Sequence, residues 1–228
     1  MQITVDTVVA APLAEVWRAY SAPEDITQWN AASDDWHTPS ASVDFRVGGT
    51  FTSRMEARDG SMGFDFAGTY TAIVEHELIE YRFGDRMARI EFAPTTGGIQ
   101  VRVTFDAETV HPVEQQRQGW QAILENFRRH VEAGRAGADV RTDLRRLVLA
   151  QYEHFAAHEA YATDLDALMA AGPYRPMEGH VAEVAGDATG FSATVRRLDA
   201  ESRPDRARIW VGAHAEHAGR EPAVIYCE

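Results

Sequence analysis

The chain has 228 residues, 45% of them hydrophobic, which is enough for two compact domains of ordinary size. Its 35 acidic side chains outnumber the 22 basic ones, and the net charge is −13. An acidic surface repels phosphate backbones and anionic membranes, so no nucleic-acid partner is expected. Because no run of about 18 consecutive apolar residues occurs, no membrane span is expected either.

The N-terminus and the cysteine content indicate a cytoplasmic protein. Residues 1–9 alternate polar and apolar side chains and lack the basic start and apolar centre of a signal peptide. Cys227 is the only cysteine, which excludes an intramolecular disulfide and a cysteine-based metal site. Gly48-Gly49 and Gly97-Gly98 fit hairpins better than a phosphate-binding loop, and no cofactor is predicted.

The first half of the chain predicts one strand, two short helices and a meander of strands. Apolar side chains at every second position from Ile3 to Val9 indicate a half-buried strand. Pro12 suits the first turn of a helix that reaches Tyr20, and a second short helix is expected over 24–29. Turn residues with hairpin spacing then separate six strands, which should pair antiparallel. These strands cover residues 42–47, 50–57, 64–74, 78–83, 86–93 and 99–107.

A long amphipathic helix is expected after His111-Pro112, because apolar residues recur there at spacings of three and four. About 20 helical residues span roughly 30 Å, enough to lie along a strongly curved sheet. The glycine pair Gly134 and Gly137 then predicts a linker at 134–138, which ends the first domain at residue 133. The apolar face of the helix comprises Val113, Gln116, Trp120, Ile123, Leu124, Phe127 and Val131.

Residues 139–228 predict a second, smaller α+β domain. Its first helix carries an apolar stripe from Val140 to Phe155, and Thr163 can cap a short helical turn that reaches Leu168. The remainder of the domain has β character. The expected strands cover residues 179–185, 189–198, 206–213 and 223–226.

The order of elements in residues 1–133 is that of an α+β helix-grip fold, in which a curved antiparallel sheet wraps a long C-terminal helix. The segments that carry a family resemblance are 11–17 (APLAEVW), 28–29 (QW), 45–51 (FRVGGTF), 68–70 (GTY) and 119–127 (GWQAILENF). With them the domain resembles the SRPBCC, or START-like, superfamily, in the branch related to the activator of the heat-shock-chaperone ATPase. The resemblance implies a cavity for lipid-like, polyketide-like or aromatic molecules between sheet and helix.

Residues 141–228 more faintly resemble the globular domain of bacterial type IV pilins. The matching segments are 143–147 (DLRRL), 151–155 (QYEHF), 161–165 (YATDL), 189–194 (TGFSAT) and 209–212 (IWVG). Two departures argue against a fibre. A soluble domain replaces the apolar N-terminal helix of pilins, and Ala207 stands where a partner for Cys227 would be expected. The resemblance therefore implies an accessory module for packing or protein interaction.

Ligand-contacting residues are predicted among the large apolar side chains of the sheet and the long helix, each with core packing as its alternative role. Strand alternation places Phe64, Phe66 and Tyr70 on one face together with Gly68, which leaves space there. The predicted set is Trp29, Phe45, Phe51, Phe64, Phe66, Tyr70, Tyr81, Trp120, Ile123, Leu124 and Phe127.

Charged and histidine side chains offer weaker candidates. Five arginines in predicted strands alternate with apolar neighbours and are expected on the solvated face, although one turned inward could bind a ligand carboxylate. Three histidines in predicted loops or at the helix start could place a general base near a cavity mouth. The histidine pairs at 154/158 and 214/217 lack a third ligand, so no metal is predicted. These arginines are Arg46, Arg54, Arg82, Arg89 and Arg102, and the three histidines are His37, His76 and His111.

Binding of an apolar small molecule is the function that these patterns favour. An enzyme of the cyclase or hydratase kind could use the same cavity, with one or two polar groups moving protons. A structural or regulatory protein is the third reading, in which residues 139–228 recruit a protein partner through an exposed apolar patch.

Overall fold

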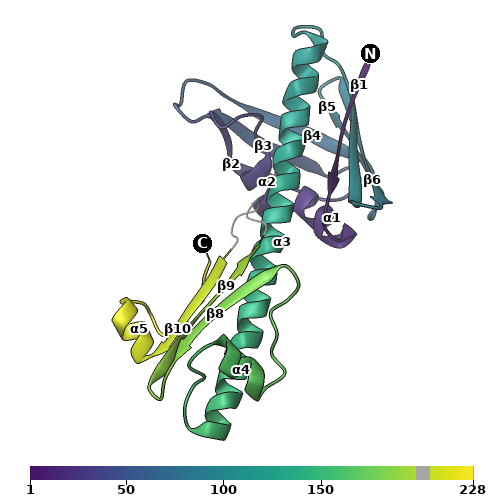
Figure 1. The fold of residues 1–228 in the computed structure, drawn as a ribbon. Helices are drawn as coiled ribbons and strands as arrows, with labels where there is room; N and C mark the ends of the chain where they lie inside the picture. The colour runs from purple at the N-terminus through teal and green to yellow at the C-terminus, as the bar shows by residue number, and fades with distance from the viewer. Residues whose placement is uncertain (199–205, 228) are drawn as a thin grey trace. The chain divides into compact units, whose positions relative to one another are not determined.

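The structure is a computed structural model that describes residues 1–198 and 206–227. Contacts divide the chain into two units, Met1–Glu132 and Ala133–Glu228. Each unit has its own sheet and its own hydrophobic core (Figure 1). Among the described residues, no helix combines the length and the apolarity needed to cross a bilayer.

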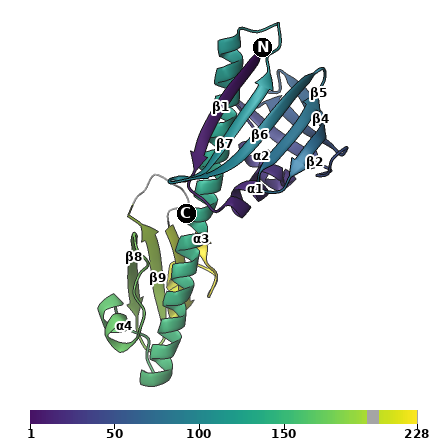
Figure 2. The same ribbon diagram turned by 90° about the vertical axis from the view of Figure 1, so that its right-hand side faces the viewer.

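The first unit is an antiparallel sheet of seven strands with the order β1-β7-β6-β5-β4-β3-β2. The first half of helix α3 lies across this curved sheet, and two short helices follow β1 (Figures 1 and 2). This arrangement confirms the predicted helix-grip fold. The elements are β1 (Gln2–Val9), α1 (Leu13–Ser21), α2 (Pro23–Trp29), β2 (Trp36–Val43), β3 (Thr50–Ala57), β4 (Gly63–Val74), β5 (Leu78–Phe83), β6 (Arg86–Thr95), β7 (Gly98–Asp106) and α3 (Val113–His158).

Alternation of side chains explains why the strands bury one face. In β1, Ile3, Val5 and Val9 are buried, while the polar residues between them are exposed or half-buried. β1 pairs with β7, where Val103 and Phe105 are buried in the same way. Apolar side chains at every second position therefore turn toward α3 and form one core with it.

The strand predicted at 42–47 is wrong in its limits, because β2 covers Trp36–Val43. Pro39 lies inside β2, although proline cannot donate a hydrogen bond to a sheet. β2 lies at the edge of the sheet, where the missing donor costs little, and its register shifts between His37 and Ser40. Residues 44–49 form a turn instead, with Gly48 at φ +82°.

The linker predicted at 134–138 does not interrupt the chain's helix, because α3 is one continuous helix over Val113–His158. Gly134 and Gly137 lie inside it, where each glycine costs only about 1 kcal/mol relative to alanine. The alanines and the arginine around them are strong helix formers, and Ala136 is buried. Two isolated glycines are too weak to end this helix.

The second unit packs the last part of α3 against a four-stranded antiparallel sheet with the order β11-β10-β9-β8 (Figure 2). Asp164, and not the predicted Thr163, caps the short helix, because its side chain accepts a hydrogen bond from the Ala167 amide. A helix packed on a small sheet agrees with what the pilin resemblance implies, but kinship with pilins stays a prediction. The elements are α4 (Leu165–Ala171), β8 (His180–Gly186), β9 (Gly190–Arg197), β10 (Arg206–Gly212), α5 (Ala213–Ala218) and β11 (Tyr226–Cys227).

Candidate functional site

The candidate site is a cavity of about 220 Å³ in the first unit. Strands β3, β4, β5 and β7 line it on one side, and helices α1, α2 and α3 line it on the other. The sixteen lining residues are all uncharged. The cavity is therefore an apolar space inside the helix-grip unit, of the kind that holds small organic molecules.

Local sequence explains how each wall is built. In β3, Phe51, Ser53 and Met55 follow one another at every second position and are buried on the same face. In α3, Ile123 and Leu124 follow Trp120 at spacings of three and four, so one side of the helix carries all three. The rings pack closely, with the Phe51 and Tyr81 centroids 4.8 Å apart. Except for Asn30, which follows α2, the lining residues thus belong to helices and strands rather than to loops.

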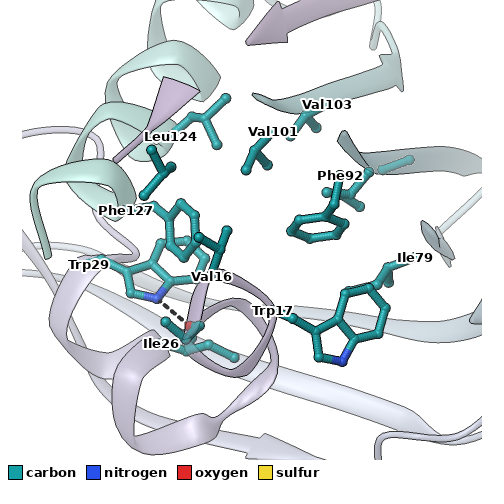
Figure 3. Close-up of a cluster of buried hydrophobic side chains, with 14 of the residues drawn as sticks. Val16, Trp17, Ile26, Trp29, Ile79, Phe92, Val101, Val103, Leu124 and Phe127 are labelled. Carbon is teal, nitrogen blue, oxygen red and sulfur yellow. Dashed lines mark hydrogen bonds between the residues drawn. The ribbon is translucent and has the colours of Figure 1, made fainter. Parts of the chain in front are cut away.

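Nine of the eleven predicted ligand-contacting residues line this cavity, and Phe45 and Phe127 lie in the core beside it. Figure 3 shows Phe127 next to Trp29, and their ring centroids are 5.1 Å apart. The dashed line there marks the hydrogen bond that the Trp29 indole donates to the Ala19 carbonyl, with a donor–acceptor distance of 3.0 Å. The nine lining residues are Trp29, Phe51, Phe64, Phe66, Tyr70, Tyr81, Trp120, Ile123 and Leu124.

Seven further lining residues were not predicted from the sequence. Period-two alternation from Phe51 points to Ser53 and Met55, so this signal was present. Nothing in the sequence shows how the short helices sit on the sheet, and that placement brings Tyr20 into the wall. The seven are Tyr20, Ile26, Asn30, Ser53, Met55, Ile79 and Val103.

The space expected at Gly68 is filled by an aromatic ring. A Cβ atom at Gly68 would lie 2.7 Å from the Phe51 ring and 2.6 Å from the Arg82 carbonyl oxygen. Both distances are far shorter than van der Waals contact, and a backbone carbonyl cannot move aside easily. Glycine is therefore needed at this position for the close approach of strand and ring.

Gly68→Ala should destabilise the first unit by about 1–3 kcal/mol, because the added methyl overpacks this contact. Urea unfolding followed by tryptophan fluorescence measures the effect. Gly119→Ala is the matched control, since nothing lies within 4 Å of a Cβ there. Alanine in that helical position should stabilise by up to about 1 kcal/mol. Equal unfolding midpoints for Gly68→Ala and the wild type would contradict the packing argument.

Three tyrosines give the cavity its main polar groups. Burial raises the pKa of Tyr20, Tyr70 and Tyr81 well above the usual value, and Coulombic repulsion between the phenolates adds to this for Tyr20 and Tyr81. The three hydroxyls therefore stay protonated and neutral at physiological pH. Groups of this kind donate hydrogen bonds and do not act as bases.

The raised tyrosine pKa values make the first unit sensitive to alkali. In the unfolded chain a tyrosine phenol titrates near pH 10, whereas the buried phenol titrates at higher pH. The free energy of unfolding is therefore unaffected by these groups below about pH 10 and falls as the pH rises above it. Tyr20→Phe removes one such group and should shift the alkaline unfolding midpoint to higher pH in circular dichroism. Tyr152→Phe, in the second unit, should leave it unchanged. An unaltered midpoint in Tyr20→Phe would refute the assignment.

The five arginines of the predicted strands do not line the cavity, so the alternative of an inward arginine that binds a carboxylate is wrong. Arg46, Arg82, Arg89 and Arg102 are exposed, and Arg54 is half-buried. Neighbouring carboxylates on the sheet surface pair with some of them, as Glu80 and Glu91 do with Arg89. The solvated face is therefore where these charges lie.

The candidate histidines also lie outside the cavity wall. His37 Nε2 is 3.9 Å from Glu56 Oε2, the His76 ring packs 5.7 Å from Trp17, and His111 Nδ1 is 2.7 Å from Glu108 Oε1. The rings of His154 and His158 stack at 4.2 Å. In the described part of the chain, no three His, Cys, Asp or Glu side chains gather as metal ligands would.

The helix-grip sheet and the apolar cavity agree with a family match over residues 10–132. These residues match the family described as activator of Hsp90 ATPase homolog 1-like (AHSA1-like) protein. The chain belongs to this family. The AHSA1-like family is part of the SRPBCC superfamily, whose members typically bind hydrophobic ligands. No protein of curated function matches the chain.

Solved structures similar to the chain cover its AHSA1-like part. The AHSA1-like protein from Aeromonas hydrophila is 44% identical, with a TM-score of 0.56, and the match covers 59% of this chain and 94% of that protein. Chr148 from Cytophaga hutchinsonii is 43% identical, with a TM-score of 0.52 and coverage of 58% and 93%. CV1439 from Chromobacterium violaceum is 28% identical, with a TM-score of 0.52 and coverage of 58% and 98%.

Proposed function

We propose that the AHSA1-like unit binds a small apolar molecule in its cavity. The observation that carries this proposal is a cavity of about 220 Å³ whose lining, among the residues that the structure describes, has no charged side chain. An apolar protein cavity of about 150 Å³ takes up benzene, so this one has room for a molecule of one or two rings. It is smaller than the roughly 300–1,000 Å³ of drug-binding pockets, which favours compact ligands over long-chain lipids.

Aromatic walls suit an aromatic ligand. Trp29 and Trp120 are both in the lining, and Phe66 lies 6.2 Å from Trp120 between ring centroids in an edge-on arrangement. Aromatic rings in such arrangements add attraction beyond the burial of their area. Phe64 lines the cavity and is 51% exposed, so it lies where the wall meets solvent. A planar hydrocarbon is therefore a suitable first probe.

The test is titration of the full chain with naphthalene, measured by calorimetry and by tryptophan fluorescence. We expect saturable binding of one molecule per chain. Ile123→Trp should weaken it at least tenfold, because Ile123 lines the cavity and an indole would occupy the space. Val113→Trp is the matched control, since Val113 is exposed on the same helix. Absence of saturable binding in the wild type, or equal affinity in both variants, would sink the proposal.

An enzyme of the cyclase or hydratase kind has less support than a binding protein. Proton transfer needs a group whose pKa lies near the working pH. The titratable groups of the lining are the three tyrosines, and burial raises their pKa away from that range. Histidines and carboxylates, which would have favoured catalysis, do not line the cavity.

A protein partner for the second unit stays a prediction. Leu149, Tyr152 and Phe155 are exposed on α3 at spacings of three, so the helix presents them close together. Exposed apolar groups of this kind occur at protein contact sites. This role is independent of ligand uptake by the AHSA1-like unit.

A further inference from the structure

We propose that the ligand is a neutral carbonyl compound whose oxygen accepts hydrogen bonds from the cavity tyrosines Tyr20, Tyr70 and Tyr81. The inference rests on the proposed function and narrows it. The tyrosine hydroxyls would contact the polar end of the ligand, and the aromatic walls would contact its apolar body.

The three tyrosines come from different elements and meet in one cavity wall. Tyr70 in β4 and Tyr81 in β5 are direct partners across the two strands, and their ring centroids are 6.4 Å apart. Tyr20 comes from α1, and Coulombic repulsion from Tyr70 adds to burial in raising the pKa of Tyr20, as repulsion from Tyr20 does for the pKa of Tyr81. All three line the cavity. Three phenol groups are thus gathered around one small space.

None of the three hydroxyls has a hydrogen-bond partner within residues 1–198 and 206–227. Two other polar groups of the wall have partners: the Asn30 amide reaches the Met55 sulfur, and the Trp29 indole donates to a backbone carbonyl. Among the described residues, these hydroxyls are not fully enclosed, so each keeps some accessible surface in the cavity. A hydroxyl in an apolar cavity without a protein partner is unfavourable. Phenylalanine would fill the same volume without that cost. Retention of three tyrosines in the lining of one cavity is therefore best explained by a ligand atom that their hydroxyls bind.

The charge of the wall restricts what that atom can be. The lining contains no charged side chain, and the nearby strand arginines Arg54 and Arg82 are outside it. A carboxylate or ammonium group would therefore be buried without a counter-ion, which is strongly unfavourable. The phenols stay protonated, so each offers one O–H donor. A carbonyl oxygen is neutral and has two lone pairs, which suits it to accept from more than one of them.

A matched pair of probes isolates the oxygen. 2-Acetylnaphthalene and 2-isopropenylnaphthalene have the same shape, and a C=CH₂ group replaces the C=O group in the second. We expect the variants Tyr20→Phe, Tyr70→Phe and Tyr81→Phe each to weaken the ketone by about threefold to tenfold. The alkene should bind each variant as well as the wild type or more tightly. Tyr152→Phe, in the second unit, should change neither affinity.

The outcomes separate this inference from the proposed function. If the wild type binds both probes and each variant changes the two affinities by the same factor, or changes neither, the carbonyl inference fails and the cavity function stands. If the wild type binds neither probe nor naphthalene, both fail. Melting temperatures of the variants verify folding, which these substitutions should preserve because the rings remain. As an independent readout, the carbonyl stretch of bound 2-acetylnaphthalene should lie at lower frequency in the wild type than in the triple phenylalanine variant.

Discussion

Phe127→Ala should destabilise the AHSA1-like unit by about 3–5 kcal/mol, the usual cost of removing a large ring from a packed core. The Phe127 side chain is 0% exposed. Its ring centroid is 5.2 Å from that of Tyr20 and 5.1 Å from that of Trp29, so the Phe127 ring packs α3 against the two short helices. Its loss leaves a void between three elements, and none of them can close it alone. Urea unfolding followed by tryptophan fluorescence is the measurement.

Phe64→Ala is the control for this prediction, because it removes the same ring from a position that is 51% exposed. We expect it to cost less than about 1 kcal/mol of stability. It should weaken naphthalene binding, however, since Phe64 lines the cavity. Similar stability losses in the two variants would show that Phe127 is not a central packing residue.

Asp143→Ala should destabilise the second unit by about 3 kcal/mol. Asp143 is 0% exposed, and its carboxylate serves several partners at once. The Met177 amide donates to it at 2.8 Å, His180 Nδ1 lies 3.0 Å away and an Arg146 guanidinium nitrogen lies 3.1 Å away. Removing the carboxylate leaves the amide and the histidine buried without their acceptor. Because Trp210 belongs to β10 of this unit, its fluorescence during urea unfolding reports the change.

Asp139→Ala tests whether burial causes the effect, since Asp139 lies one turn earlier on α3 and is partly exposed. Its pair with Arg135 is long, at 3.9 Å, and such surface pairs contribute about 0–1 kcal/mol. We expect the stability of this variant to be nearly that of the wild type. A loss as large as that of Asp143→Ala would mean that helix charge, and not the buried network, stabilises the unit.

Sequence patterns predicted the sheet well where side chains alternate without interruption. β3 is predicted to the residue, and β5 as well, because buried apolar positions alternate with polar ones and a turn stands at each end. Prediction failed at β2, where a long-range contact overrides a local signal, and inside α3, where neighbouring residues outweigh two glycines. Pro39 is accommodated because β2 is an edge strand, and sheet order is a property of the whole fold. Gly134 and Gly137 are held in α3 because their neighbours favour the helix.

The apolar wall of the site was largely visible in the sequence, as were Tyr70 and Tyr81, whereas Tyr20 was not predicted. Trp120, Ile123 and Leu124 share a helix face by spacing alone. Tyr20 could be recognised only as part of a short amphipathic helix, and its meeting with Tyr70 and Tyr81 depends on how that helix docks on the sheet. The packing of the short helices also explains why Phe127, predicted to line the cavity, lies in the core beside it.

By itself, the sequence determined the helix-grip class, the family resemblance and the aromatic character of the predicted cavity wall, since these depend on local periodicity and on residue types along the chain. Only the tertiary structure decided the size of the cavity, the presence of three tyrosines in its lining and the absence from that lining of the arginines that the structure describes. The physical reason is that periodicity places a side chain on a face. Which faces meet, and at what distance, depends on packing between elements far apart in the chain.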